Sequence, residues 1–189
     1  SNMFTRMLNG IYAESYGRGD VEIHENDLEN TSYGIEAYSN NLSIWGNLIK
    51  GENAENSFTG IYAEGSGNVN ANRVSVGDAG RDGNSATGIE LYSTSSFDAR
   101  SRGIFAYNNM VVIDGFSRVR GFDVYANTSS NVMTRIYHNS VNITGTIFDN
   151  DGIEQDKGDN VQGFAAPNSV AAYFNGNSAV DAVNNIWHN

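Results

Sequence analysis

The chain has 189 residues, enough for one domain with a real hydrophobic core. Its 22 acidic and 11 basic residues give a net charge of −11, which repels nucleic-acid phosphates and anionic lipid headgroups, so nucleic acid is excluded as a partner. The chain contains no cysteine, so it forms no disulfide, and no apolar run approaches the roughly 20 residues of a membrane-spanning helix. We therefore expect no direct membrane insertion.

A five-residue motif that opens on glycine recurs along the chain. The glycine is followed by a large apolar residue, a variable residue, a smaller apolar residue, and then a polar or aromatic one. The copies are Gly10–Glu14, Gly34–Tyr38, Gly60–Glu64, Gly88–Tyr92 and Gly121–Tyr125, with a weaker sixth at Val170–Phe174. Apolar and polar residues alternate in each copy, which predicts a strand with one buried face.

An asparagine follows each of these motifs at a second recurring position. The asparagines are Asn26, Asn47, Asn72, Asn109, Asn139 and Asn185. Each has an apolar residue three positions earlier and another two positions later, as Ile44 and Ile49 flank Asn47. Odd and even offsets point to opposite faces of a straight strand, so the chain must bend near each asparagine. We predict an inward column of amides that bond from coil to coil, and the alternative is a set of turn asparagines facing solvent.

The spacing of the glycine motifs predicts the architecture. Successive glycines lie 24, 26, 28 and 33 residues apart, whereas ankyrin-like and leucine-rich repeats hold their unit length. We predict an all-β fold, a right-handed parallel β-helix (solenoid) of about six coils, as a single domain over residues 1–189. Residues 1–3 resemble a cloning remnant, and the sequence stops in mid-coil. We expect a fragment of a longer protein, or an uncapped coil that makes an end-to-end contact.

Two segments resemble a known family. They are Ile136-Tyr137-His138-Asn139-Ser140-Val141 and Val180-Asp181-Ala182-Val183-Asn184-Asn185-Ile186-Trp187. Both look like the Asn-rich coils of large secreted bacterial surface proteins within the right-handed parallel β-helix superfamily, whose fold is pectate-lyase-like. The resemblance implies a secreted or cell-surface location. It implies little about activity, because function on such a scaffold depends on the sites that it carries.

The third and fifth motif residues form an outward stripe of tyrosines and carboxylates. The pairs are Tyr12 and Glu14, Glu36 and Tyr38, Tyr62 and Glu64, Glu90 and Tyr92, and Asp123 and Tyr125. Tyrosine rings offer flat surfaces to sugars, and carboxylates accept hydrogen bonds from hydroxyls. We predict a noncatalytic module, structural or carbohydrate-binding through this stripe, with polysaccharide as the expected partner. A purely structural origin of the pattern stays open, because alternation separates like charges and lets rings pack on their neighbours.

The alternative function is a polysaccharide-degrading enzyme, a glycoside hydrolase or a polysaccharide lyase. Its candidate catalytic residues are Glu36, Glu64 and Glu90, since diagonal carboxylates on the stripe could reach the roughly 6.5–9.5 Å separation of an inverting glycosidase. Polygalacturonase-like members of the superfamily carry Asn-Thr-Asp, Asp-Asp, Gly-His-Gly and Arg-Ile-Lys segments. None of these segments occurs in this sequence, which disfavours the enzyme.

One acidic segment is a candidate for binding calcium. Asp149, Asp151 and Asp156 lie close together and offer the oxygen ligands that Ca²⁺ prefers. The spacing is not that of an EF-hand, so a solvated insertion loop is the alternative. We expect no cofactor, and Ca²⁺ at this loop is the one candidate.

Overall fold

A computed structural model describes residues 3–5, 9–15, 19–52, 57–77, 85–94, 103–114, 118–126, 133–144, 169–175, 180–183 and 185–188. The regular elements within these ranges are all β-strands. They form two sheets, and within each sheet the paired strands run parallel.

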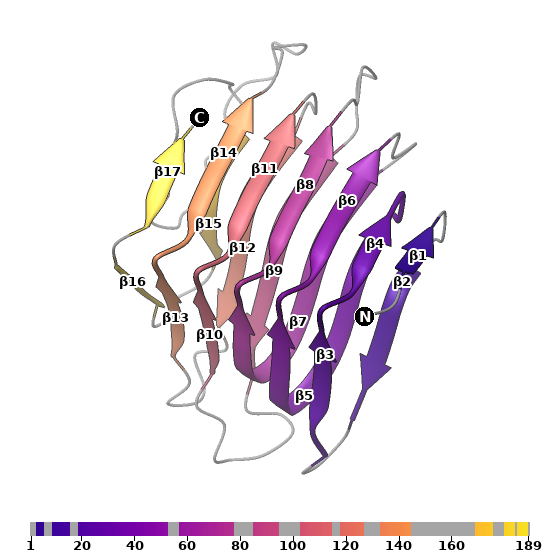
Figure 1. Ribbon diagram of the computed structural model, residues 1–189. Coiled ribbons are helices and arrows are strands. Elements are labelled where there is room, and N and C mark those ends of the chain that lie inside the picture. The colour runs from indigo at the N-terminus through magenta and orange to yellow at the C-terminus, as the bar shows by residue number, and fades with distance from the viewer. Residues whose placement is uncertain are drawn as a thin grey trace.

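The first sheet, which we call the post-Asn sheet, is built from the strands that follow the asparagines (Figure 1). Its strands, in spatial order, are β1 (Met3–Thr5), β4 (Asp27–Glu29), β6 (Leu48–Glu52), β8 (Arg73–Gly77), β11 (Met110–Asp114), β14 (Ser140–Thr144) and β17 (Ile186–His188). Each strand pairs with the corresponding strand of the next coil, so spatial order follows chain order.

The second sheet carries the other two segments of every coil. Its strands are β2 (Asn9–Glu14), β3 (Val21–His24), β5 (Tyr33–Trp45), β7 (Ser57–Asn70), β9 (Ser85–Ser93), β10 (Ile104–Tyr107), β12 (Arg118–Ala126), β13 (Thr134–Tyr137), β15 (Ser169–Asn175) and β16 (Val180–Val183). The long strands β5 and β7 join the two segments, and β2 and β3 pair with different parts of β5. We call the part formed by the glycine motifs the Gly-motif face, and the part just before the asparagines the pre-Asn face.

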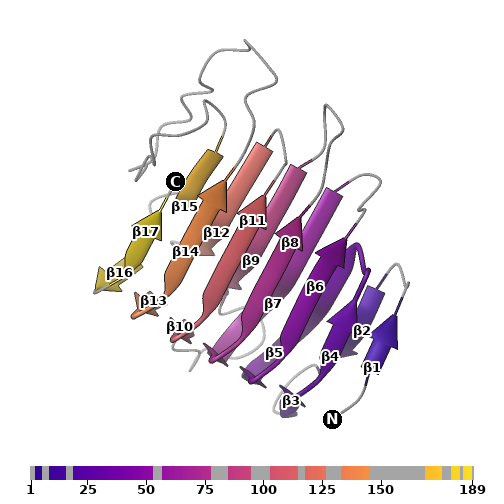
Figure 2. The same cartoon turned by 45° about the horizontal axis from the view of Figure 1, so that its top comes forward.

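The path of the chain is a right-handed coil. In Figure 1 the post-Asn strands run upward in front, the Gly-motif strands run downward behind, and successive coils advance from right to left. Figure 2 shows the same two layers from above, with the coils stacked in chain order. The predicted right-handed parallel β-helix is therefore confirmed, and the weak sixth motif lies in β15, paired with β12.

The bend at each of the first five ladder asparagines comes from the residue before it. These residues have a left-handed backbone: Glu25 (φ 53°), Gly46 (φ 65°), Ala71 (φ 54°), Asn108 (φ 55°) and His138 (φ 56°). A single residue with positive φ reverses the alternation of side chains. Apolar residues at odd and even offsets from the asparagine, such as Ile44 and Ile49, can therefore both be buried.

The asparagines form a continuous ladder inside the coil. Asn47 Nδ2 donates to Asn72 Oδ1 (2.9 Å) and to the Ile23 carbonyl (3.0 Å). Asn47 Oδ1 accepts from the backbone N–H and from Nδ2 of Asn26, both at 3.1 Å. The coil-to-coil amide bonds repeat from Asn72 to Asn109, Asn139 and Asn185. The ladder prediction is confirmed, and because Asn47, Asn72 and Asn139 are about 1% exposed, the solvent-facing alternative is wrong.

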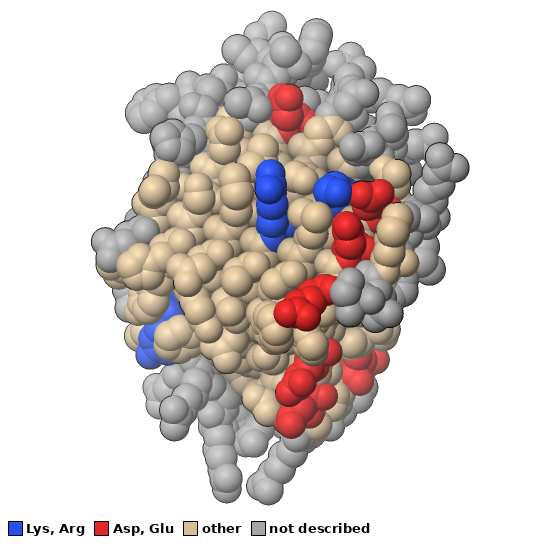
Figure 3. Space-filling view, viewed as in Figure 1, with Lys and Arg blue, Asp and Glu red and all other residues tan. Residues whose placement is uncertain are grey.

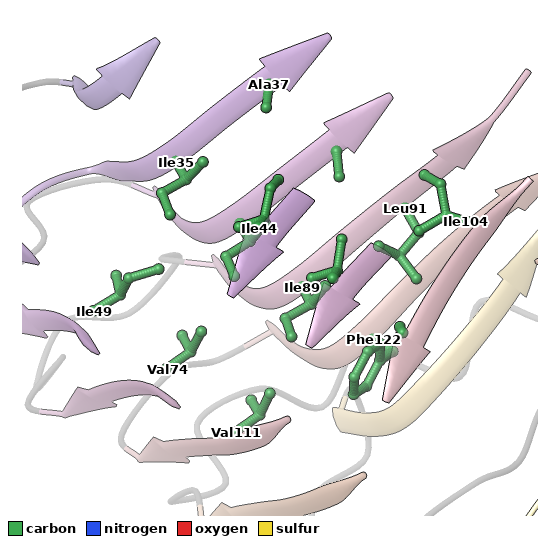
Figure 4. Packing of buried hydrophobic residues seen from close by; sticks show 14 of the residues in the cluster. Ile35, Ala37, Ile44, Ile49, Val74, Ile89, Leu91, Ile104, Val111 and Phe122 are labelled. Atoms are coloured by element: carbon green, nitrogen blue, oxygen red, sulfur yellow. The ribbon is translucent and has the colours of Figure 1, made fainter. Parts of the chain in front are cut away.

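The apolar residues of the motifs fill the space between the sheets (Figure 4). From the Gly-motif face, Ile35, Ala37, Ile89, Leu91 and Phe122 point inward toward the post-Asn sheet, where Ile49, Val74 and Val111 meet them. Not every predicted inward position is buried, because Ala182 in β16 is exposed in this last described coil.

Close packing explains why each motif opens on glycine. A Cβ atom on Gly60 would lie 2.4 Å from Val74 Cγ1 and 2.5 Å from the Gly88 carbonyl oxygen. The glycines of neighbouring coils stack on one another in the same way, as Gly88 stacks on Gly121. The glycine column thus lets the Gly-motif face approach the opposite sheet at van der Waals distance.

Candidate functional site

The strand register brings the stripe residues into two adjacent columns. The first column is Tyr12, Glu36, Tyr62, Glu90 and Asp123, and the second is Glu14, Tyr38, Glu64, Tyr92 and Tyr125. Tyrosines and carboxylates alternate along both columns through the first four coils. At the fifth coil the alternation breaks, so that two acids are neighbours in one column and two tyrosines are neighbours in the other.

In the first three coils each stripe carboxylate accepts a hydrogen bond from a tyrosine of its own strand. The Tyr12 hydroxyl donates to Glu14 Oε2 (2.9 Å), and the Tyr62 hydroxyl donates to Glu64 Oε2 (2.8 Å). The Tyr38 hydroxyl donates to Glu36 in the same way. Burial, followed by the hydrogen bond to Glu36, raises the pKa of Tyr38 above its usual value. The hydroxyls therefore stay protonated as donors to the carboxylates.

The tyrosine rings also pack against one another between coils. The Tyr12 and Tyr38 ring centroids lie 5.7 Å apart with the planes at 48°, and those of Tyr38 and Tyr62 lie 5.4 Å apart at 46°. These are tilted aromatic contacts within the favourable range. The rings and carboxylates of the first three coils thus form one bonded network across the Gly-motif face.

The break in alternation creates an acid pair on β9 and β12. Glu90 and Asp123 are register neighbours, and Arg120 forms an ion pair with Asp123 Oδ2. Asp123 is only 3% exposed, and its other oxygen, Oδ1, is buried without a hydrogen-bond partner in the described part of the chain. Burial raises the pKa of Glu90 to about 7, and the charge of Asp123 adds to this while Arg120 opposes it.

The acid pair differs chemically from the other stripe carboxylates. Burial also raises the pKa of Asp123, although Arg120 acts against this. A second carboxyl in the adjacent rung disfavours ionisation of Glu90, and a carboxyl with a pKa near neutral pH suits proton transfer. Beside them the rings of Tyr92 and Tyr125 pack at 5.8 Å. Of the predicted catalytic candidates, only Glu90 lies in such a setting, because Glu36 and Glu64 accept bonds from tyrosines.

A second outward column, on the pre-Asn face, was not found from the sequence. It consists of His24, Trp45, Asn70, Tyr107 and Tyr137, which are register neighbours on β3, β5, β7, β10 and β13. The sequence does contain a signal for it, because each member lies two residues before a ladder asparagine. The apolar residue three positions before each of the first five ladder asparagines is buried, so alternation along the strand turns the residue after it outward.

Aromatic contacts hold this column and its neighbours. His24 and Trp45 stack with centroids 4.6 Å apart and planes at 2°. Further along the same face the Arg135 guanidinium lies 4.6 Å from the centre of the Phe105 ring, and Phe105 meets Tyr137 edge to face. The pre-Asn face therefore contains imidazole, indole, phenyl and phenol rings, whereas the aromatic residues of the stripe are all tyrosines.

The outer surface of the post-Asn sheet has a different character. Figure 3 shows the face of the molecule that carries this sheet, with acidic side chains gathered at its N-terminal side and a largely uncharged remainder. Glu29 and Lys50 form an ion pair there at 2.8 Å. Because both side chains are about one third exposed, this pair contributes little to stability and marks no site.

The predicted calcium ligands Asp149, Asp151 and Asp156 lie outside the described residues. Within the described ranges, no group of three or more His, Cys, Asp or Glu side chains is arranged to hold a metal ion. The same ranges contain no helix that is long and apolar enough to cross a membrane.

In comparisons with known proteins, no family model, curated protein or solved structure matches the chain. Its parallel β-helix architecture thus rests on the strand pairing and the asparagine ladder. What the chain does must be argued from its own surfaces.

Proposed function

We propose that this chain is a noncatalytic structural module, a rigid β-helix that holds side chains in columns along its surface. The observation that carries the proposal is the internal pairing of the stripe. Glu14, Glu36 and Glu64 each accept a hydrogen bond from the hydroxyl of a tyrosine in the same coil, and the tyrosine rings pack against one another between coils. Side chains that bond to one another in this way stabilise the stack, and fewer of their polar groups are left for a ligand.

The same pairing bears on carbohydrate binding through the stripe. A sugar that lay along Tyr38 and Tyr62 would meet rings tilted at 46° to each other, with hydroxyls already engaged. We therefore assign the first three coils of the stripe to stability. The resemblance to Asn-rich coils supports placing the module on a secreted or cell-surface protein of the pectate-lyase-like superfamily.

Removing one stripe hydroxyl tests the structural role. Tyr38→Phe deletes the hydroxyl and keeps the ring, so we expect it to lower the free energy of unfolding by about 1–2 kcal/mol, near the lower end of the range for a hydrogen bond to a charged group because the pair is only partly buried. Tyr33→Phe is the matched control, because Tyr33 precedes its motif and is 38% exposed. Equal stability of the two variants, measured by denaturant unfolding, would contradict the proposal.

A polysaccharide-degrading enzyme is the second candidate, and the acid pair is the observation that favours it. Glu90, whose pKa is raised to about 7, lies beside Asp123, and glycoside hydrolysis uses two carboxyls of which one acts as an acid near neutral pH. Release of reducing ends or of unsaturated products from a polysaccharide panel distinguishes the two candidates. Turnover that Glu90→Gln abolishes and Glu14→Gln preserves would establish the enzyme, and a complete lack of turnover supports the structural module.

A further inference from the structure

The pre-Asn face contains a gap in its aromatic column. Trp45 on β5, Asn70 on β7 and Tyr107 on β10 are successive register neighbours, and all three point outward. Strands in a sheet lie about 4.8 Å apart, so the two aromatic side chains stand about 9.6 Å from each other, with only the short Asn70 side chain between them.

The stacking of His24 on Trp45 shows how the Trp45 ring is oriented. The two rings are parallel within 2°, and their separation of 4.6 Å is close to one rung. The plane of the indole therefore lies across the axis of the column. One face of the indole is covered by His24, and the other is turned toward the rung of Asn70.

The floor of this gap is polar, because it is formed by Asn70. Asn68 also points outward from β7, but its register neighbours are Ser43 and Phe105, so it lies beside the gap in the neighbouring column. Within the described part of the chain, neither the Asn68 nor the Asn70 side-chain amide makes a hydrogen bond. Each can offer two donors and an acceptor to a ligand. The gap thus lies between the Trp45 indole face and the Tyr107 side chain, with the free amide of Asn70 beneath it and that of Asn68 at its side.

The width of the gap selects the kind of ring that fits. A flat ring in van der Waals contact with both walls needs about 7–8 Å between them, since each contact takes about 3.5–4.0 Å. The gap of about 9.6 Å leaves room for a thicker, puckered ring. A saturated sugar ring has that shape, with C–H faces for the aromatic walls and hydroxyls for the amides.

We propose that the gap between Trp45 and Tyr107 binds one neutral pyranose residue of a glycan, with Asn68 and Asn70 bonding to its hydroxyls. This site lies on a different face from the stripe, so it adds a ligand to the structural module without depending on the stripe residues. The residues of the gap are uncharged, which favours a neutral sugar over a uronate.

The experiment titrates the protein with cellohexaose, chitohexaose and mannohexaose by isothermal calorimetry. We expect at least one of them to bind, and Trp45→Ala and Tyr107→Ala to weaken that binding by about tenfold or more, the loss typical of an aromatic anchor. The control variants are Asn142→Ala, exposed on the post-Asn sheet, and Tyr12→Ala on the stripe, and both should bind within about twofold of the unchanged protein.

A substitution that fills the gap separates loss of the site from loss of the fold. Asn70→Trp continues the aromatic column, so it should raise the thermal midpoint or leave it unchanged while abolishing sugar binding. Binding that survives Asn70→Trp would overturn the proposal. Absence of binding by all three hexasaccharides at millimolar concentration would also overturn it.

Discussion

Replacing the ladder residue Asn72 with alanine is expected to destabilise the protein more than removing any single side-chain amide outside the ladder. The Asn72 side chain donates to the Ile44 carbonyl (2.9 Å) and to Asn109 Oδ1 (3.1 Å), and it accepts from the N–H (3.1 Å) and Nδ2 (2.9 Å) of Asn47. The variant loses all four bonds. Asn47 Nδ2 keeps its bond to the Ile23 carbonyl, but the buried N–H of Asn47 loses its acceptor.

The size of the effect follows from these groups. An orphaned buried N–H costs about 1–3 kcal/mol, and each further hydrogen bond contributes about 0.5–1.5 kcal/mol net. We expect a loss of about 3–5 kcal/mol, a large part of the 5–15 kcal/mol that typically separates folded from unfolded states. Asn72→Asp should be at least as damaging at neutral pH, because it places a carboxylate oxygen against the Ile44 carbonyl or Asn109 Oδ1.

Guanidinium unfolding followed by far-UV circular dichroism measures the loss. Asn142→Ala is the control, because Asn142 is exposed on β14, and we expect it to change stability by less than about 0.5 kcal/mol. If Asn72→Ala cost no more than Asn142→Ala, the ladder would contribute nothing to stability, and the argument from satisfied amides would be refuted.

Three further predictions test other parts of the structure. Gly60→Ala places a Cβ 2.4 Å from Val74 Cγ1 and 2.5 Å from a carbonyl oxygen, so it should lower the thermal midpoint by several degrees. In the control Gly77→Ala nothing lies within 4 Å of the added atom, so the thermal midpoint should stay unchanged. Equal midpoints for the two variants would refute the packing argument. Ala71→Gly relieves a left-handed backbone (φ 54°) that costs about 1–2 kcal/mol, and it loses about 0.5–1 kcal/mol of backbone entropy. Denaturant unfolding should therefore show a net gain in stability of up to about 1.5 kcal/mol, and a loss would contradict the prediction. Folding raises the pKa of Glu90 from 4.5 to about 7, so the folded state holds this proton more tightly, and stability present below pH 4.5 should be lost as pH rises toward 7. Glu90→Gln should flatten that part of a plot of thermal midpoint against pH, and an unchanged slope would show that Glu90 is not responsible.

Much of the fold could be predicted because its pattern is local. The inward positions of the glycine motifs and the offsets around each asparagine are fixed by alternation along a few residues, and Ile35, Ala37 and Ile49 are buried as predicted. The stripe was also predicted as an exposed outward set, and Asp123, which is only 3% exposed, departs from this prediction. The internal bonding of the stripe was not predicted, because the choice of Glu36 as the acceptor of Tyr38 depends on side-chain orientation.

The bend was predicted from the offsets around each asparagine, but the residue that makes it had no recognisable signal. The left-handed position before the first five ladder asparagines is occupied by Glu25, Gly46, Ala71, Asn108 and His138, which share no residue type. Gly46, Asn108 and His138 are of types found more often in this backbone region, whereas Glu25 and Ala71 are not. At Glu25 and Ala71 the buried asparagine and the parallel pairing on both sides hold the conformation against its local cost.

Sequence by itself determined which residues face inward, that the chain coils, and that six amides share one column. The tertiary structure alone decided which surface residues become neighbours, because loops of different length are absorbed between the rungs while the strand register is kept. That register puts Glu90 beside Asp123, 33 residues later, and places Asn70 between Trp45 and Tyr107. Pairing between parallel strands far apart in sequence is a nonlocal contact, so the recurring motifs indicate which residues can become neighbours and only the folded chain fixes that they do.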